Sequence, residues 1–481
     1  MALNQPPRPR ETVFRQPRLR DVRPRVAQSV PERRPHRVFS SPYILFMGFV
    51  LLIVIGGLLL ALPISSHQDG FTNPVTAFFT AVSAVTVTGH TVVNTTTYWS
   101  GFGQAVIFFL MLVGGLSFMA ATTFLLALLG QRSTLPERLV ARDTVGTDRM
   151  EGLRRVTRNI MIVVFLFYVV GAAAIFWRIN GLDGMRLGES VWQSVFLSVS
   201  SFNNAGFSIL PESAPGSGLA RLSSQWGLLG FMTVLMILGG IGWTVMVDVT
   251  RRRRFARLSL DTKLVIVTSL FLWILGAGVF FLAEYGRAET IGSFGLFDKS
   301  VSAIFHSVSG RTAGFTTVDF GLVDDFTKLA YAPLMFIGGA AGSVAGGIKV
   351  TTVAVIIVAV LSSMRGRSEA EAFGREIAHF QVLRAITVAA LGLGFMGVVI
   401  PTLTLTEPDI PFVDLLFDTV SAFGTNGTTT GIVPDLSLAG KSIFMVAMFV
   451  GRLGPLTLAL ALAPREEASL YSFARERVKI G

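Results

Sequence analysis

Long apolar stretches dominate the pattern of hydrophobic and polar positions along this chain. A membrane-spanning helix needs about 20 predominantly apolar residues, and seven windows approach or exceed that length. They are Tyr43–Leu62, Gly103–Leu129, Ile160–Trp177, Trp226–Val247, Leu264–Leu282, Gln381–Ile400 and Ser442–Ala463. Windows of this length predict helices in a lipid bilayer rather than the core of a soluble domain.

Four short polar stretches centred on glycine interrupt the apolar background at regular intervals. They read VSAVTVTGHT (82–91), VSSFNNAGFS (199–208), SVSGRTAGFT (307–316) and VSAFGTNGTT (420–429). The aligned glycines of these glycine stretches, Gly89, Gly206, Gly314 and Gly427, are separated by 117, 108 and 113 residues. Such regular spacing indicates a fourfold internal repeat.

A second signature follows each glycine stretch and strengthens the repeat. It reads MLVGG (111–115), MILGG (236–240), MFIGG (335–339) and MFVGR (448–452). Each repeat therefore predicts a long apolar helix, a short helix, the glycine stretch and a second long helix. In the first repeat Asn73 is the expected N-cap of the short helix, and Pro74 is its expected first residue.

These patterns predict an all-α integral membrane protein. Four tandem helix–pore-loop–helix units in one chain would surround a pseudo-fourfold pore and contribute eight transmembrane spans. We expect these units at residues 41–130, 131–250, 251–364 and 365–465. A basic disordered tail (1–40) and a short C-terminal segment (466–481) would flank them. Basic residues concentrate between the units, which predicts that both termini are cytoplasmic.

Charge and composition restrict the class of protein further. Only 15% of the 481 residues are charged, and the net charge is +11. The first 40 residues carry ten arginines against three acidic residues, and other basic clusters lie between apolar windows. This distribution favours membrane topology over nucleic-acid binding. The chain has no cysteine, and its five histidines show no metal-ligand spacing, so we expect no enzyme activity.

The glycine stretches suggest a path for a cation. Irregular backbone at membrane depth is tolerated only where protein buries it or where it lines water. Backbone carbonyls from four such stretches could replace the hydration shell of a dehydrated monovalent cation. Small residues at these positions would also permit close helix packing, which is the alternative interpretation. The residues predicted to form the ion-binding filter are Val87, Thr88, Gly89, Asn204, Ala205, Gly206, Thr312, Ala313, Gly314, Thr425, Asn426 and Gly427.

A glycine-rich segment and a single arginine suggest a gate below the filter. GGAAGSVAGGIK (338–349) interrupts the last helix of the third repeat, and Arg452 lies inside an apolar window. An arginine at membrane depth is by default functional. Close helix packing of the segment, and a structural ion pair or carbonyl anchor for Arg452, remain the alternatives. The predicted gate residues are Arg452, Gly338, Gly339, Gly342, Ser343, Gly346, Gly347 and Lys349.

Together these motifs resemble those of the Trk/Ktr/HKT superfamily of potassium transporters, most closely its bacterial KtrB-like membrane subunits. The resemblance covers about residues 40 to 465 and rests on the glycine stretches, on GGAAGSVAGGIKVTT and on VGRLGPLTLAL. It implies potassium uptake across a bacterial plasma membrane, with K⁺ held by backbone carbonyls of the filter. The intramembrane glycine-rich segment would be the gating loop.

The resemblance also implies partners. Members of the superfamily form homodimers in the lipid bilayer and bind a ring of cytoplasmic nucleotide-binding (RCK-type) subunits. Those subunits sense ATP and ADP, and Na⁺ activation is common among Ktr members. We therefore expect no cofactor in this chain itself. Its tail and basic loops are candidate contact surfaces for the regulatory ring.

Two positions depart from the pattern of the superfamily. His90 follows Gly89 where a leucine-like residue is usual, and Asn426 and Thr428 flank Gly427 where apolar residues are usual. Their side chains could hydrogen-bond filter carbonyls or admit water, which bears on the preference for K⁺ over Na⁺.

The main rival hypothesis is a sodium- or proton-coupled cation symporter, because coupled carriers often use broken helices. All four repeats run in the same direction, and the predicted spans lack an acidic residue that would relay protons. Both features favour the pore.

Overall fold

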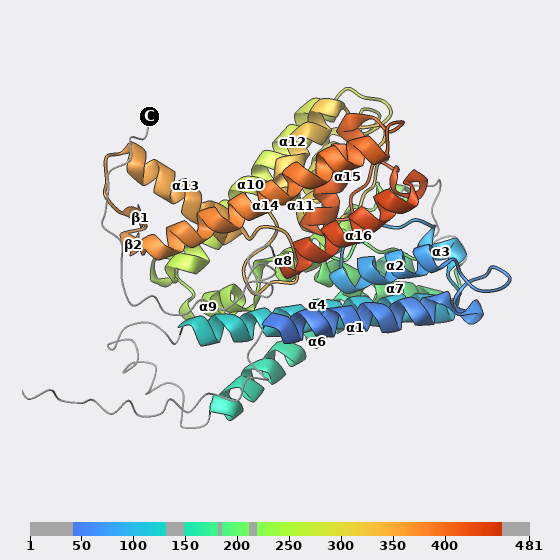
Figure 1. The fold of residues 1–481 in the computed structure, drawn as a ribbon, viewed down its shortest axis with the longest axis horizontal. Coiled ribbons are helices and arrows are strands. Elements are labelled where there is room, and N and C mark those ends of the chain that lie inside the picture. The colour runs from blue at the N-terminus through green and yellow to red at the C-terminus, as the bar shows by residue number, and fades with distance from the viewer. Residues whose placement is uncertain (1–41, 131–148, 181–184, 211–218, 455–481) are drawn as a thin grey trace, which may run out of the picture. The chain divides into compact units, whose positions relative to one another are not determined.

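The structure, a computed structural model, describes residues 42–130, 149–180, 185–210 and 219–454. The predicted tail (1–40) and C-terminal segment (466–481) lie outside the described residues, as does the end of the last predicted apolar helix. The regular structure of the described part is mostly α-helical, as expected. Four times along the chain, a long α-helix is followed by a short one and then by one or two further helices, which can be followed in Figure 1.

We call the four recurrences helix sets one to four. Set one contains α1 (Pro42–Ala61), α2 (Pro74–Thr86), the one-turn α3 (Thr95–Tyr98) and α4 (Gly101–Gly130). Set two contains α6 (Arg149–Ile179), α7 (Leu187–Asn203), α8 (Trp226–Ile241) and α9 (Trp243–Arg252). Set three contains α10 (Leu260–Glu284), α11 (Leu296–Thr312), α12 (Asp325–Phe336) and α13 (Val350–Met364). Set four contains α14 (His379–Thr406), α15 (Phe412–Gly424) and α16 (Leu438–Leu453).

The second helix of each set (α2, α7, α11 or α15) is short, with 13 to 17 residues, below the length that spans a bilayer. In α2 the predicted start is confirmed. The Asn73 side chain accepts a hydrogen bond from the Val75 amide at 2.9 Å, and Pro74 is the first helical residue. Proline suits this position because the first helical amide has no partner within the helix.

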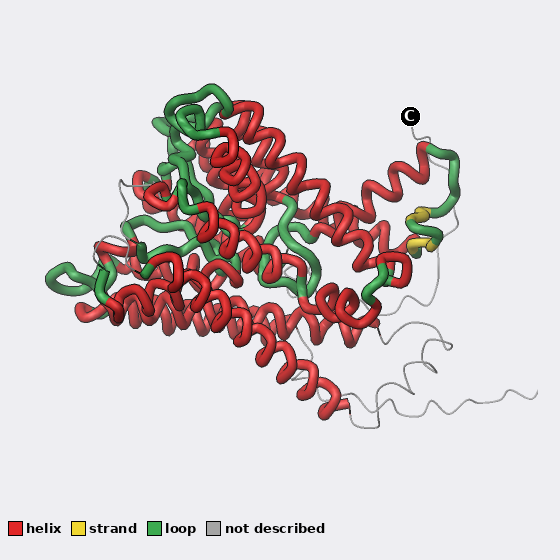
Figure 2. The backbone as a smooth tube through the Cα atoms, turned by 180° about the vertical axis from the view of Figure 1, so that it is seen from behind, coloured by secondary structure: helices red, strands yellow, loops and turns green. Residues whose placement is uncertain are grey.

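A small antiparallel hairpin between α13 and α14 was not predicted (Figure 2). Strand β1 (Ala370–Ala372) pairs with β2 (Arg375–Ile377), with Ala370 opposite Ile377. Phe373 and Gly374 form the turn with φ of +52° and +71°. Two positive φ angles are typical of the turn that joins such strands. Phe-Gly is an uncommon pair there, so the sequence carried only a weak signal.

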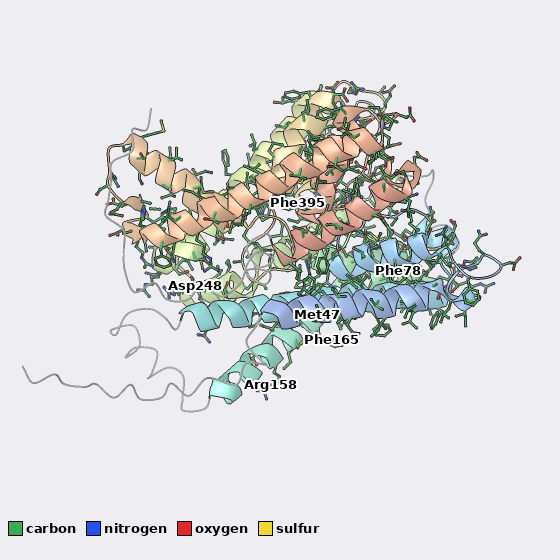
Figure 3. All side chains as sticks on the ribbon, viewed as in Figure 1. Met47, Phe78, Arg158, Phe165, Asp248 and Phe395 are labelled. Atoms are coloured by element: carbon green, nitrogen blue, oxygen red, sulfur yellow. The ribbon has the colours of Figure 1, made fainter. Side chains whose placement is uncertain are left out.

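Three helices among the described residues are long and apolar enough to cross a membrane by themselves. They are α10, α14 and the Arg158–Ile179 part of α6. Large apolar side chains on these helices point outward, as Phe165 does on α6, where 67% of its surface is exposed (Figure 3). Exposed apolar surface on such helices is suited to contact with lipid rather than water.

The apolar window Trp226–Val247 does not form one continuous helix, which corrects the expectation from its length. The chain bends by 97° between α8 and α9. The break lies at Gly242, with φ +87° and ψ 152°. A Cβ there would lie 2.9 Å from the carbonyl oxygen of Ala341. Only glycine combines this backbone conformation with such a close neighbour.

The sets pack against one another in sequence order, and the last contacts the first. The helix after each glycine stretch contacts the short helix of the next set: α4 contacts α7, α8 contacts α11, and α12 contacts α15. Helix α16 then contacts α2, which closes the series. The four glycine stretches at the ends of the short helices are thereby brought together.

Candidate functional site

The glycines of the four glycine stretches share a backbone conformation that favours glycine. Their φ angles are +92° at Gly89, +71° at Gly206, +77° at Gly314 and +94° at Gly427. Positive φ is sterically unfavourable for residues with a Cβ atom. In each stretch, the glycine lies two or three positions after the last residue of a short helix.

The same four glycines form a closed ring of close contacts. A Cβ added to Gly89 would lie 2.5 Å from the carbonyl oxygen of Ala205, and one on Gly206 would lie 2.7 Å from that of Ala313. A Cβ on Gly314 would lie 2.3 Å from the Asn426 carbonyl oxygen, and one on Gly427 would lie 2.1 Å from that of Thr88. Each glycine therefore abuts the carbonyl that precedes the glycine of the next set. The ring has no room for side chains at these positions.

Each short helix ends in a way that directs its glycine stretch. In sets one, two and four the capping residue is left-handed: Val87, Asn204 and Thr425 have φ of +58°, +55° and +49°. In set three, Ala313 takes this place with φ −126°. The reason lies in the sequence, because Gly314 comes five positions after Ser309. In the other sets, the glycine comes six positions after Ser83, Ser200 or Ser421. Set three therefore lacks the left-handed residue.

The serine at the start of each stretch holds the glycine backbone. The Ser200 hydroxyl donates to the Phe207 carbonyl at 2.7 Å, and that of Ser309 donates to the Phe315 carbonyl at 2.6 Å. In the other two sets the serine accepts instead, from the amide of Gly89 or Gly427 at 3.1 Å. Buried serines satisfy backbone groups that the irregular stretch leaves free.

Glycines of the second signature allow close helix packing in three sets. A Cβ on Gly114, Gly239 or Gly451 would lie 2.1, 1.8 or 1.8 Å from a carbonyl oxygen near the end of the short helix of its own set. Those carbonyls belong to Val85, Phe202 and Phe423. Gly338 in set three differs, because its nearest neighbour is the carbonyl oxygen of Gly346, within the glycine-rich segment.

The glycine-rich segment breaks the last helix of set three, as predicted, and forms loop 337–349 between α12 and α13. The amides of Ala340 and Val344 donate to the carbonyls of Gly240 and Gly239 at 2.9 and 3.2 Å. The Gly347 amide donates to the Gly451 carbonyl at 3.1 Å. Backbone groups at the ends of α8 and α16 therefore hold the loop.

The loop also touches the glycine stretch of set four. The Gly346 amide donates to the Thr425 hydroxyl at 3.1 Å. A Cβ on Gly346 would lie 2.1 Å from that hydroxyl oxygen. The loop thus packs directly against the residue that begins the fourth predicted filter segment.

Arg452 links this loop to helix set one. Its side chain is 1% exposed, and its guanidinium donates to the Val344 carbonyl and, at 3.0 Å, to the Gly114 carbonyl. Lys349 donates to the Ala345 carbonyl at 2.5 Å. The predicted gate residues are therefore brought together in one place. The carbonyl-anchor alternative for Arg452 and its placement at the loop are compatible, because one of the carbonyls belongs to the loop.

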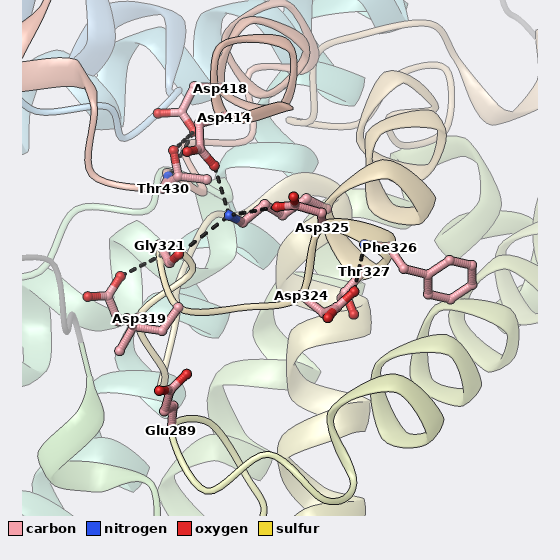
Figure 4. Close-up of polar contacts among 12 residues, drawn as sticks. Glu289, Asp319, Gly321, Asp324, Asp325, Phe326, Thr327, Asp414, Asp418 and Thr430 are labelled. Atoms are coloured by element: carbon pink, nitrogen blue, oxygen red, sulfur yellow. Dashed lines mark hydrogen bonds and ion pairs between the residues drawn. The ribbon is translucent and has the colours of Figure 1, made fainter. Parts of the chain in front are cut away.

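A cavity of about 330 Å³ lies against the glycine ring, and no residue of loop 337–349 is part of its lining. All four ring glycines line it, together with Thr91, Asn94, Asp319 and Thr430 among other residues. Near it, the buried amine of Lys328 lies 2.8 Å from Asp414 and 3.4 Å from Asp325, as Figure 4 shows for the two carboxylates. The ion pair with Asp414 joins set three to set four. We call the cavity that the four ring glycines line the mouth cavity.

The residues that depart from the superfamily pattern have defined surroundings. Asn426 donates to the carbonyl of Gly310 in α11, and Thr428 donates to the Asn426 side-chain oxygen at 3.0 Å. These two polar residues therefore tie the fourth stretch to the third short helix. His90 is fully buried, with its ring edge-on to that of Phe444 at 5.9 Å between centroids.

Two buried charged residues near the site were missed by sequence reasoning. Asp418 in α15 accepts hydrogen bonds from the Thr430 amide at 2.8 Å and from the Thr429 hydroxyl at 2.5 Å, and so orders the chain after the fourth stretch. Arg311 in α11 donates to the Gly338 carbonyl at 3.0 Å. A charge inside an apolar short helix was the available signal. Among the described residues, no group of three His, Cys, Asp or Glu side chains could hold a metal ion.

The chain is similar to known cation transport proteins along most of its length. A family model described as "TrkH: Cation transport protein" matches residues 32–471. The Ktr system potassium uptake protein B of Bacillus subtilis (strain 168) is 37% identical over 435 residues, covering 90% of this chain and 95% of the relative. The potassium/sodium uptake protein NtpJ of Enterococcus hirae is 32% identical over 460 residues, covering 94% of this chain and all of the relative.

A solved structure supports the fold. The crystal structure of the potassium transporter TrkH from Vibrio parahaemolyticus superposes with a TM-score of 0.70 and covers 90% of this chain and 87% of its own. Its sequence identity of 20% supports the fold alone. The family model spans most of the chain, and close relatives share its length. The chain therefore belongs to the TrkH cation transport protein family.

Proposed function

We propose that this chain is the pore-forming membrane subunit of a potassium uptake system. The closed ring of four glycines, each against the carbonyl before the next, is the observation that carries the proposal. A ring of carbonyls without side chains on its axis can replace the hydration shell of a dehydrated cation. The names of two relatives, a potassium uptake protein and a potassium/sodium uptake protein, support K⁺ as the transported ion.

The four helix sets would be four pore units around one pseudo-fourfold axis, with the boundaries expected at 41–130, 131–250, 251–364 and 365–465. The cyclic contacts from α4–α7 round to α16–α2 support this arrangement. Eight spans would result if the first and last helices of every unit cross the bilayer. The bent pair α8–α9 and the interrupted pair α12–α13 would each count as one span.

The filter would be formed by the residue triplets that end at the four ring glycines. These are Val87 to Gly89, Asn204 to Gly206, Thr312 to Gly314 and Thr425 to Gly427. The short helices would direct their C-terminal, partly negative ends toward the ion. The mouth cavity, with Asp319 in its lining, would hold the cation before it enters the ring.

Loop 337–349 would be the gate, and Arg452 would hold it closed. The arginine bonds the loop at Val344 and helix α4 at Gly114, so movement of the loop would break a charge-assisted hydrogen bond. Lys349, Ser343 and the loop glycines would belong to the same gate.

The regulatory parts would come from outside the chain. The word "system" in the name of the Bacillus relative supports a partner subunit. We expect a homodimer in the plasma membrane with both termini cytoplasmic, bound to a ring of RCK-type nucleotide-binding subunits that respond to ATP and ADP. Na⁺ activation would act on this assembly.

A coupled symporter is the second candidate, and Asp418 is the observation in its favour. This fully buried carboxylate accepts hydrogen bonds from Thr429 and Thr430, both of which line the mouth cavity. A carboxylate near the ion path could take up a proton or coordinate Na⁺.

Rubidium flux into proteoliposomes separates the two candidates. We expect Rb⁺ uptake driven by its own gradient, without a gradient of Na⁺ or protons. Liposomes that hold the Asp418→Asn variant provide the matched control, and a pore predicts that this variant still conducts Rb⁺. Uptake that stops when the Na⁺ or proton gradient is removed would exclude the pore.

A further inference from the structure

Arg311 is a buried cation between the third glycine stretch and loop 337–349. It lies in the last turn of α11, three residues before Gly314, and 3% of its surface is exposed. Its guanidinium donates to the Gly338 carbonyl at 3.0 Å and lies 5.4 Å from the centre of the Trp273 ring. It therefore bridges the filter side of set three and the first residues of the loop.

The surroundings of Arg311 do not compensate its charge well. No carboxylate in the described part of the chain forms an ion pair with it, and its Nε and Nη1 atoms donate to no acceptor there. Burying a charge without an ionic partner is expensive. A leucine or methionine would fill this position at lower cost, so packing alone does not explain the arginine.

The register of set three shows what Arg311 replaces. At the equivalent position, two residues after the serine, the other sets have Val85, Phe202 and Phe423. In those sets the backbone carbonyl of this residue packs against a glycine that lies inside a continuous helix. In set three that glycine is Gly338, which lies beyond the end of α12. Its carbonyl is therefore free to accept the Arg311 side chain.

Two contacts join the filter side to opposite ends of the loop. Arg311 of set three binds Gly338 at the start of the loop, and Thr425 of set four binds Gly346 near its end. Asn426 donates to the carbonyl of Gly310, the residue before Arg311. The third and fourth stretches thus meet beside Arg311. If the loop were displaced, the third stretch would lose its contact with Gly338 and the fourth would lose its contact with Gly346.

We propose that Arg311 is a positioning residue that couples loop 337–349 to the filter. While the loop is closed, the hydrogen bond from Arg311 to the Gly338 carbonyl holds the third glycine stretch in place. When the loop moves, the bond breaks and the third stretch is no longer held from below. The inference rests on the proposed function, because it takes this loop to be the gate.

The test combines Arg311 variants with a shortened loop that lacks residues 340–345, in the full chain and without the regulatory subunit. Rb⁺ flux and the ratio of Na⁺ to Rb⁺ permeability are measured in proteoliposomes. In the intact loop, we expect Arg311→Met to raise flux about tenfold, the factor that corresponds to about 1.4 kcal/mol, and to raise relative Na⁺ permeability. Arg311→Lys keeps a donor and is expected to stay near the parent chain. Arg311→Gln replaces the Met variant in the test if Arg311→Met does not fold.

The shortened loop supplies the decisive comparison. There we expect Arg311→Met to raise flux no further. The deletion keeps Gly338 but removes Ala340 and Val344, whose amides anchor the loop to α8, so Gly338 is no longer held in its closed position. Unchanged flux in the folded Met and Gln variants of the intact chain would overturn the inference, as would an equal increase in both loop backgrounds. If shortening the loop alone leaves flux unchanged, the gate in the proposed function is wrong, whatever the Arg311 variants do.

Discussion

Gly427 and Gly431 have nearly the same φ angle but different surroundings. Their φ angles are +94° and +96°. A Cβ on Gly427 would lie 2.1 Å from the Thr88 carbonyl oxygen, whereas a Cβ on Gly431 would meet nothing within 4 Å. A positive φ favours glycine at both positions. At Gly427, which belongs to the ring, the close carbonyl also leaves no space for a side chain, whereas Gly431 has open space around it.

This pair gives a prediction for alanine substitution. We expect Gly427→Ala to lower Rb⁺ flux about tenfold or more, because the methyl group overpacks the ring. Gly431→Ala is expected to add only backbone strain, about 1–2 kcal/mol, and to conduct normally once folded. Flux is measured in proteoliposomes with matched protein content. Equal losses in the two variants would mean that strain, not the ring, explains the effect.

At the element scale, buried carboxylates tie the first helix of a set to the helix after its glycine stretch. Glu284, the last residue of α10, accepts hydrogen bonds from the Asp324 amide at 3.1 Å and the Thr327 hydroxyl at 2.6 Å, at the start of α12. Glu407, just after α14, accepts in the same way from the amide and hydroxyl of Ser437 at the start of α16. A carboxylate suits a helix N-terminus because free amides and the helix dipole favour negative charge there.

Removal of the Glu284 carboxylate should destabilise set three. We expect Glu284→Ala to lower the free energy of unfolding by about 2–3 kcal/mol, because charge-assisted hydrogen bonds are lost and their donors stay buried. Thermal unfolding in detergent, followed by tryptophan fluorescence, measures the loss. Glu289→Ala is the control, since that side chain is 64% exposed and pairs only with Arg287 at 3.6 Å among the described ion pairs. A control variant as unstable as Glu284→Ala would refute the assignment.

At the scale of the whole molecule, the contact between the last and first sets closes the arrangement. Phe449 of α16 packs edge-on against Phe46 of α1, with ring centroids 5.4 Å apart. Residues about 400 positions apart in the chain thereby become neighbours. The ring contact between Gly427 and Thr88 depends on this closure, because it joins the same two sets.

Cysteine cross-linking can test the closure, because the natural chain has no cysteine. We expect Phe46→Cys with Phe449→Cys to cross-link quickly with a short bifunctional methanethiosulfonate, as seen by mass spectrometry of the digest. Phe46→Cys with Phe271→Cys is the control, because exposed Phe271 belongs to α10 in set three. A mixture of the two single variants detects links between chains. Similar cross-linking in all three samples would contradict a closed single-chain ring.

Much of the local helical structure could be read from the sequence. Local patterns determine where apolar helices form, so the mostly helical structure, the start of α2 and the break at loop 337–349 agreed with the structure. The bend at Gly242 was not foreseen, because its cause is the neighbouring loop around Ala341 rather than the helix itself. The Phe373–Gly374 hairpin was also missed, because its turn uses an uncommon residue pair.

By itself, the sequence determined that four glycine stretches exist and that each needs an irregular backbone next to a short helix. The sequence does not reveal that Gly89 faces Ala205, that Gly427 faces Thr88, or that Arg311 reaches Gly338. These contacts differ from local structure in the distance along the chain over which they act. Helix formation and chain reversal depend on neighbours within a few residues, whereas the ring joins backbone atoms from segments more than 100 residues apart, whose positions only the packing of all four sets defines.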